Sequence, residues 1–330
     1  MLNIYQEIQK RILVLDGAMG TMLQAYKFTE EDFRGKRFKN YPTSLQGNND
    51  LLSITQPKAI KEIHAKYFAA GADIIETNTF SGTTIAMADY QMEDLVYELN
   101  YQSAKIAKEI ADEFTQKEPH KPRFVAGSIG PTNRTASMSP DVNDPGYRAV
   151  TFNELRIAYR QQVEALLDGG CDMLLVETVF DTLNAKAALF AIEEVKEARK
   201  IDVPIMLSGT ITDASGRTLS GQTAEAFLIS ISHIPLLSVG FNCALGANLL
   251  QPHLEEIASK TNFAISAHPN AGLPNAFGEY DETAQEMADQ IEEYFKKNLI
   301  NIIGGCCGTT PEHIAVIAQL ATKYPPRKCL

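Results

Sequence analysis

Three cysteines beside two apolar runs form the residue pattern with the clearest chemistry in this 330-residue chain. Cys243 follows the run Leu237–Asn242, and the adjacent pair Cys306 and Cys307 follows Asn301–Gly305. Each group opens into a glycine-containing loop, which is where a parallel α/β protein places its reactive groups. Three cysteine sulfurs with no fourth cysteine in range are typical of a zinc ion that keeps one coordination position open for a substrate.

Disulfides are the alternative use of these thiols, either within the adjacent pair or between Cys306 and Cys243. Five cysteines in 330 residues are sparse and leave one unpaired, whereas disulfide-dense proteins are small and secreted. Cys171 precedes the apolar run Met173–Val176, so we expect it to be inert and at the opposite end of a strand. Cys329, close to the C-terminus, is expected to be a free surface thiol.

Composition and charge restrict the compartment and the partners. The formal net charge of −11 disfavours nucleic acid and anionic membranes. The N-terminal segment lacks the apolar stretch of a signal peptide, and no run approaches the length of a transmembrane helix. The sequence therefore predicts a soluble cytoplasmic protein, in a reducing compartment, that binds neither nucleic acid nor membrane.

Eight short apolar runs alternate with longer amphipathic segments, which is the pattern of repeated βα units. The candidate strands are Ile12–Asp16, Asp73–Thr77, Arg123–Ile129, Asp172–Thr178, Pro204–Ser208, Leu236–Asn242, Asn262–Ala267 and Ile300–Gly304. Among the intervening segments, Pro57–Ala70 has the start and stop signals of a helix, and Thr309–Glu312 fits a capping box. The pattern predicts a (β/α)8 TIM barrel that forms a single domain over residues 1–330.

Two long segments exceed what such a barrel needs: Tyr26–Asn49 after the first strand and Pro131–Gly146 after the third. Insertions after strands lie on the face where a barrel keeps its active site, so we expect them to shape the site or dock a partner. Surface decoration is the alternative. In the same layout, the cysteines follow strands six and eight and can converge over one rim.

Taken together, several motifs resemble the homocysteine S-methyltransferase family. They are Leu15–Thr21, Gly71–Phe80, Val176–Thr178, Gly240–Cys243 and Gly304–Gly308. Within that family the chain is most similar to the homocysteine-binding barrel of cobalamin-dependent methionine synthases. The segments that carry this finer likeness are Gly47–Leu52, Gly130–Asn133, Ser139–Val142 and His268–Pro274. The resemblance covers nearly the whole chain.

The resemblance implies that zinc, held by Cys243, Cys306 and Cys307, activates L-homocysteine for S-methylation to methionine. Zinc coordination deprotonates a thiol that is otherwise mostly protonated at neutral pH, and the thiolate is the nucleophile. Methylcobalamin on a partner module is the expected methyl donor. This chain ends before the folate- and cobalamin-binding modules of a full methionine synthase and has no Asp-x-His-x-x-Gly motif. We therefore expect a fragment or a separate subunit whose donor modules lie on another polypeptide.

The amino-acid end of homocysteine needs an acceptor for its ammonium group and donors for its carboxylate. Glu177, at the end of the fourth strand, is the candidate for the ammonium, and the resemblance agrees. Asp16 and Gly17 are expected to complete the cradle, with backbone N–H groups near Ala18 and Met19 reaching the carboxylate. The alternative for Asp16 is a helix or turn cap.

Four further residues have secondary hypotheses. The amide oxygen of Asn270 is expected to fill the fourth zinc position when substrate is absent, with water as the alternative. His268 is expected to be structural or to support the metal ligands. Asn242 is expected to steady a cysteine sulfur, and Glu76 ranks below Glu177 as an ammonium acceptor.

Two other functions remain open. A standalone methyltransferase would take its methyl group from a small sulfonium or betaine-type donor, although the chain has no Trp with which to build an aromatic cage. A non-catalytic barrel would instead use the cysteines for structural zinc or as a redox pair.

Overall fold

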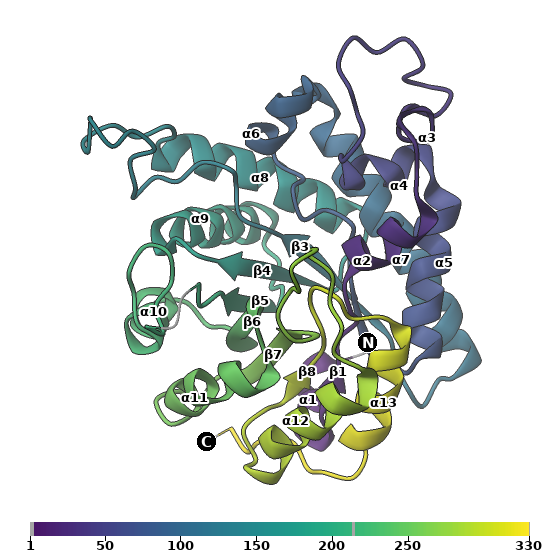
Figure 1. Ribbon diagram of the computed structural model, residues 1–330, viewed down its shortest axis with the longest axis vertical. Coiled ribbons are helices and arrows are strands. Elements are labelled where there is room, and N and C mark those ends of the chain that lie inside the picture. Colours follow the sequence, from purple (N-terminus) through teal and green to yellow (C-terminus); the bar gives the residue numbers. More distant parts are fainter. Residues whose placement is uncertain (1–2, 213–214, 330) are drawn as a thin grey trace.

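The computed structural model describes residues 3–212 and 215–329, in which eight parallel strands form a barrel with helices outside it (Figure 1). The strands are β1 Leu13–Val14, β2 Ile74–Glu76, β3 Phe124–Ile129, β4 Met173–Val179, β5 Ile205–Gly209, β6 Ser238–Gly246, β7 Ala264–Asn270 and β8 Ile302–Ile303. They pair in the order β1-β8-β7-β6-β5-β4-β3-β2, and a parallel bridge between Leu15 and Ile74 closes the ring. Every candidate run overlaps a strand, so the predicted (β/α)8 TIM barrel is confirmed.

Helices occupy the connections between successive strands. They are α1 Ile4–Lys10, α2 Met19–Tyr26, α3 Glu30–Arg34, α4 Leu52–Thr55, α5 Pro57–Ala69, α6 Thr84–Met87, α7 Val96–Lys117, α8 Phe152–Asp168, α9 Thr182–Arg199, α10 Ala224–Ile231, α11 Ala247–Ala258, α12 Ala284–Lys296 and α13 Pro311–Ala321. Three short 3₁₀ helices add η1 Asn49–Leu51, η2 Ala88–Tyr90 and η3 Glu93–Leu95.

Helix boundaries follow the start and stop signals in the sequence, except at the start of α13. Helix α5 begins at Pro57, and Gly71 adopts a φ of +109° just after it, as the sequence predicts. The capping box predicted at Thr309–Glu312 was wrong by one residue, because α13 begins after Thr310, whose side chain meets His313 Nδ1 at 3.0 Å. The Thr309 side chain is used elsewhere, as described below.

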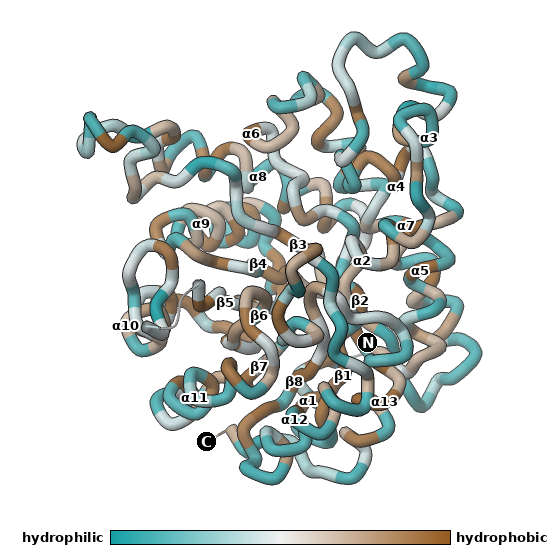
Figure 2. Tube along the Cα trace, viewed as in Figure 1, coloured by the Kyte–Doolittle hydropathy of each residue, from teal (hydrophilic) through white to brown (hydrophobic). Residues whose placement is uncertain are grey.

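Alternation along the strands, many of whose residues are hydrophobic (Figure 2), separates two apolar clusters. Inward residues fill the barrel interior: Leu13, Leu15, Ile74, Phe124, Ala126, Met173, Leu175, Met206, Leu237, Ala264 and Ile302. Ile4 and Ile8 of α1 join this cluster and cover the N-terminal end of the barrel. Outward residues such as Val14, Ile75 and Leu174 pack against the surrounding helices.

Strands β6 and β7 run several residues further than the sequence predicts. Strand β6 continues to Gly246 through a register shift after Asn242, because pairing with β7 resumes between Gly246 and Asn270. Cys243 therefore lies inside an irregular strand end rather than after the strand, and its φ of +62° is unusual for a non-glycine residue. Asn270 likewise lies in β7 and not in the loop that follows.

The two insertions differ in how they are held against the barrel. The first contains α3 and is fastened by Glu30, whose carboxylate accepts the backbone N–H groups of Leu45 and Gln46. The second, residues 131–146, projects away from the barrel beside α8 (Figure 1) and exposes 94% of Val142.

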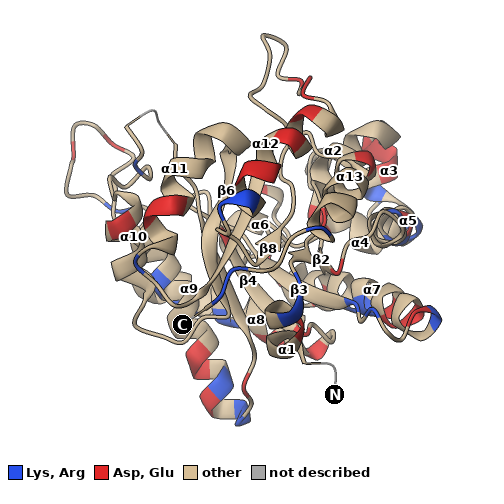
Figure 3. Ribbon diagram, turned by 90° about the horizontal axis from the view of Figure 1, so that it is seen from below, with Lys and Arg blue, Asp and Glu red and all other residues tan. Residues whose placement is uncertain are grey.

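Many of the charged residues belong to the outer helices (Figure 3). Within the described ranges, no helix combines the length and hydropathy that a membrane crossing requires.

Close strand packing at Gly240 gives a stability prediction. A Cβ built on Gly240 would lie 1.7 Å from the carbonyl oxygen of Ser266 on β7. Gly240→Ala should therefore lower the free energy of unfolding by about 3 kcal/mol or more, because overpacking forces a backbone shift. Urea unfolding followed by circular dichroism measures this change. Gly20→Ala in α2 is the control, since nothing lies within 4 Å of that position; an equal loss in both variants would contradict the prediction.

Candidate active site

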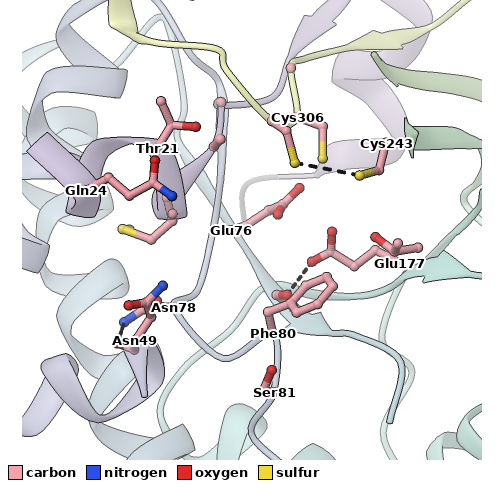
Figure 4. A pocket seen from close by; sticks show the side chains of 18 of the residues that line it. Thr21, Gln24, Asn49, Glu76, Asn78, Phe80, Ser81, Glu177, Cys243 and Cys306 are labelled. Carbon is pink, nitrogen blue, oxygen red and sulfur yellow. Dashed lines mark hydrogen bonds between the residues drawn. The ribbon is translucent and has the colours of Figure 1, made fainter. Parts of the chain in front are cut away.

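A cavity of about 760 Å³ opens at the C-terminal ends of the strands (Figure 4). Its floor is formed by inward-pointing polar side chains at the ends of β2, β3, β4, β6 and β7: Glu76, Ser128, Glu177, Asn242 and His268. Its walls come from the loops after β1, β2, β7 and β8 and from the end of the first insertion, residues 47–50. The first insertion therefore shapes the site as predicted, whereas residues 131–150 do not line this cavity.

The three predicted cysteines come together on one side of the cavity. The sulfurs of Cys243, Cys306 and Cys307 all lie within 4.8 Å of one another, and Cys243 Sγ is 3.7 Å from Cys307 Sγ. All three thiols are free, and this separation is well beyond the ~2.05 Å of a disulfide bond. Strand β7 positions the pair, because its Pro269 carbonyl accepts the N–H of Cys306 at 2.8 Å. Cys171 precedes β4 at the opposite end of the barrel, and Cys329 is exposed, as predicted.

The crowding of the three thiols favours one thiolate. Hydrogen bonds from Cys243 and Cys306 lower the pKa of Cys307 to about 3. The same contacts, together with burial, raise the pKa of Cys306. Tyr280, in the loop after β7, lies beside Cys307, and burial and the Cys307 charge raise the pKa of its hydroxyl. One negative charge is thus stable in this cluster, and removing further protons needs a cation.

Three carboxyl groups face the cysteines across the cavity. Glu177 accepts a hydrogen bond from Ser128 Oγ, and Asp16 accepts the Glu76 backbone N–H at 3.1 Å. Burial raises the pKa of Glu177 to about 7. Burial and the charge of Glu177 raise the pKa values of Glu76 and Asp16 well above their usual range. The cluster can therefore bind an organic cation, which would favour its ionised form.

Asp16 is not the simple cap that the alternative reading of the sequence suggested. Its carboxylate reaches the next strand, β2, while its backbone carbonyl accepts the N–H of Gly305 at 3.0 Å. Beside it, Thr309 Oγ1 accepts the Ala18 N–H at 3.1 Å and donates to the Cys306 carbonyl at 2.6 Å. Thr309 therefore joins the loop after β1 to the loop that carries the cysteine pair.

The N-terminus of α2 faces the cavity without a side-chain cap. The Ala18 N–H is already used by Thr309, but Met19, Gly20 and Thr21 begin the helix, and their backbone N–H groups have no intrahelical acceptor. Backbone N–H groups at a helix start bind carboxylates. Of the two predicted N–H groups, that of Ala18 is taken by Thr309, whereas that of Met19 has no intrahelical acceptor.

Strand β7 supplies two buried side chains with unsatisfied polar atoms. Asn270 is 1% exposed, and its Oδ1 has no hydrogen-bond partner. His268 lines the cavity, both of its ring nitrogens are unpartnered, and burial lowers its pKa to about 3. A buried acceptor without a partner costs stability unless a donor or cation is present, so both residues suit a site that binds a further group.

Asn242 contacts the end of β4 rather than only a cysteine. Its Oδ1 accepts the Thr178 N–H at 2.9 Å, and its Nδ2 donates to Thr178 Oγ1 at 2.8 Å. Nδ2 also lies 4.0 Å from Cys306 Sγ. Thr178 has a φ of +53°, a conformation that costs a β-branched residue about 1–3 kcal/mol.

Sequence reasoning missed several residues of the site. Ser128 and Tyr280 contact predicted residues but were not themselves predicted, and Thr309 was expected only as part of a capping box. Asp50 lines the far side of the cavity, where its carboxylate accepts the Ser81 N–H at 2.8 Å. Burial raises the pKa of Asp50 to about 7. Period-two alternation along β3 was the one available signal, since it points Ser128 inward beside Glu177.

Comparisons with known proteins agree with this fold. A profile of the homocysteine S-methyltransferase family matches residues 13–321. Crystal structures of the homocysteine methyltransferase MmuM from Escherichia coli have a similar fold. The metallated and oxidized forms each give a TM-score of 0.74 at 24% identity, covering 96% of this chain and 98% and 99% of theirs. The apo form gives a TM-score of 0.69 at 23% identity, with 96% and 98% covered.

Fold, site and family profile together define a (β/α)8 methyltransferase. The chain belongs to the homocysteine S-methyltransferase family.

The buried acid Asp50 gives a prediction for stability against pH. Its pKa is raised from 3.8 to about 7, so the folded state binds more protons than the unfolded state between these values. This stabilisation is complete below pH ~4 and is lost as the pH rises through ~7. Asp50→Asn keeps an acceptor for the Ser81 N–H and should remove that loss, which is worth at most roughly 4 kcal/mol. Urea unfolding of both proteins between pH 4 and 8 measures the difference; parallel stability curves would contradict it.

Proposed function

We propose that this chain uses zinc to activate L-homocysteine and methylates it to methionine, with methylcobalamin on a partner module as the methyl donor. The proposal rests on one arrangement: three sulfurs within 4.8 Å of one another face a carboxyl cluster across a single cavity. A small molecule with a thiol at one end and an ammonium group at the other complements both sides. The free thiols support a cytoplasmic setting for this step of methionine biosynthesis.

The residues fit a zinc ion. Cys243, Cys306 and Cys307 supply three soft sulfur ligands, and the orphaned Oδ1 of Asn270 is the proposed fourth donor in the absence of substrate. When bound, zinc supplies a position at which the homocysteine thiol loses its proton and stays nucleophilic. Asn242 and the β7 backbone orient the sulfurs, and Tyr280 covers the Cys307 side.

The opposite wall orients the amino-acid end of the substrate. Glu177 is the proposed partner of the ammonium group, supported by Asp16 and by Glu76, which lines the cavity as well. Ser128 holds the Glu177 carboxylate through its hydroxyl. An ammonium ion at this point favours the ionised form of Glu177, whose pKa burial has raised to about 7.

The substrate carboxylate is assigned to the start of α2. The contacts there leave the N–H groups of Met19, Gly20 and Thr21 as donors, while Gly17 allows close approach to Tyr67 and Thr309. A Cβ on Gly17 would lie 2.6 Å from Thr309 Oγ1, so a larger residue would displace the loop.

The space left above the substrate suits a donor presented from outside. The cavity is much larger than one small amino acid, and its remaining lobe is lined by Gln24, Asn49 and Asn78. Apolar side chains stand exposed near its mouth: Phe80 is 41% exposed, and Phe277 in the loop after β7 is 88% exposed. Such exposed apolar groups are typical of protein–protein contacts. Methylcobalamin presented at this mouth would supply the methyl group and retain the electron pair of the broken bond.

A small sulfonium or betaine-type donor is the second candidate. Six acids line one cavity, more than a single ammonium group needs: Asp16, Asp50, Glu76, Glu177, Glu279 and Asp281. A second cationic substrate would account for the surplus. The similar MmuM structures are of a homocysteine methyltransferase that the present chain matches over nearly its full length.

Zinc coordination tests the first part of the proposal. X-ray absorption at the zinc edge should show one zinc per chain, with three sulfur ligands and one light atom, and a fourth sulfur after L-homocysteine is added. Asn270→Ala should alter only the substrate-free spectrum, because its Oδ1 is the proposed light ligand. A site without zinc, or one that homocysteine leaves unchanged, would favour a non-catalytic barrel with structural metal or redox-active cysteines.

The identity of the methyl donor is tested by comparing the reaction rates that two donors support. The zinc-loaded protein should convert homocysteine and free methylcobalamin to methionine and cob(I)alamin, followed anaerobically by cobalamin absorbance and by mass spectrometry. S-methylmethionine in place of methylcobalamin should give at most ~1% of that rate, a difference of about 2.7 kcal/mol in the barrier. The reverse preference would replace the carrier-borne donor with a sulfonium donor.

A further inference from the structure

We infer that Asn242 is a positioning residue that couples the ammonium-binding end of β4 to the cysteine cluster. The inference rests on the proposed function, because it concerns how the two ends of homocysteine are held at a fixed separation. Strands β4 and β6 are not neighbours in the barrel, since β5 lies between them. The Asn242 side chain nevertheless reaches from β6 to β4 and forms two hydrogen bonds there.

These two bonds stabilise an unfavourable backbone conformation. Thr178 has a φ of +53°, in the left-handed region that β-branched residues rarely adopt. Asn242 accepts the Thr178 N–H at 2.9 Å and donates to Thr178 Oγ1 at 2.8 Å, so the amide satisfies both the backbone and the side chain of the strained residue. Asn242 is only 1% exposed, and water does not readily replace it.

The conformation of Thr178 sets the direction of Glu177. Pairing between β4 and β5 shifts register between Val176 and Val179, and Glu177 and Thr178 lie inside this bulge. Bulges change the direction of side chains next to active sites. Holding Thr178 therefore fixes the carboxyl group that precedes it, which points into the cavity (Figure 4).

The same amide borders the cysteine cluster. Cys243 follows Asn242 directly and starts the irregular end of β6 with a φ of +62°. Asn242 Nδ2 lies 4.0 Å from Cys306 Sγ. The Asn242 side chain thus contacts Thr178, beside the proposed ammonium site, and Cys306, in the sulfur cluster. These two contacts fix the distance between the ammonium site and the cluster.

Ligand binding to the full-length, zinc-loaded protein tests this role. Asn242→Ala should weaken L-homocysteine binding about tenfold by isothermal titration calorimetry, which equals about 1.4 kcal/mol. With 4-mercaptobutanoate, which has the thiol but no amino group, the same substitution should change the Kd by less than about twofold, because the Glu177 contact is absent in both proteins. An equal loss for both thiols would overturn the coupling to Glu177.

Asn301→Ala is the matched control. Asn301 is also buried and also bridges segments, accepting the Ile265 N–H at 3.0 Å and donating to the Arg327 carbonyl at 2.7 Å, but at the opposite end of the barrel. Its loss should lower the Tm and leave the Kd for homocysteine unchanged. If Asn301→Ala weakened homocysteine binding as much as Asn242→Ala, the effect would be general destabilisation and the inference would fail.

Glycine at position 178 gives a second, independent test. Glycine adopts positive φ without help, so in a Thr178→Gly background the removal of the Asn242 amide should cost less than about threefold in Kd. An undiminished tenfold cost would overturn the role assigned to backbone strain. Should Asn242→Ala not fold, Thr178→Val removes only the Oγ1 contact and should still weaken homocysteine selectively over 4-mercaptobutanoate.

The outcomes separate this inference from the proposed function. A wild-type protein that binds neither zinc nor homocysteine would refute the proposed function itself. Normal wild-type binding that Asn242→Ala and Thr178→Val both leave unchanged would refute only the positioning role.

Discussion

Closure of eight parallel strands into a barrel forces every second side chain inward, and the rest of this structure depends on that constraint. Along β4 the inward positions read Met173, Leu175 and Glu177, so the interior changes from apolar to ionisable within one repeat of the strand. The same change occurs on β2, from Ile74 to Glu76. The apolar side chains nearer the N-terminal end of the barrel exclude water. The polar side chains above them are buried, so water does little to stabilise their charged forms.

That shortage of solvent explains the chemistry of the site. Burial and neighbouring acids raise the pKa values of Glu76 and Asp16 on one wall, and thiol contacts with burial raise that of Cys306 on the other, whereas the pKa of Cys307 is lowered. Each wall therefore gains from a cation: an ammonium group beside Glu177 and a metal ion among the sulfurs. A substrate with an ammonium group at one end and a thiol at the other would place a positive charge beside the carboxyl groups and a sulfur atom at the cysteine cluster.

The barrel fold and the convergence of the three cysteines could be predicted because both depend on patterns among residues close together in the sequence. Apolar runs, helix stops and the position of Cys243, Cys306 and Cys307 at strand ends follow from the order of residues alone. The strand bulges were not predictable, since the register shifts after Val176 and Asn242 depend on neighbouring strands. Contacts between residues distant in sequence, such as Thr309 with Ala18, left no signal in either segment.

The hydrogen bond between Ala18 and Thr309 spans 291 positions of the chain. It joins the first strand's loop to the last strand's loop, so the substrate cradle and the cysteine pair meet only at the seam where the barrel closes. During synthesis, Thr309 must leave the ribosome before this seam can form. A nascent chain therefore cannot assemble the three-sulfur cluster before that point, and a metal ion held by the cluster would bind only afterwards.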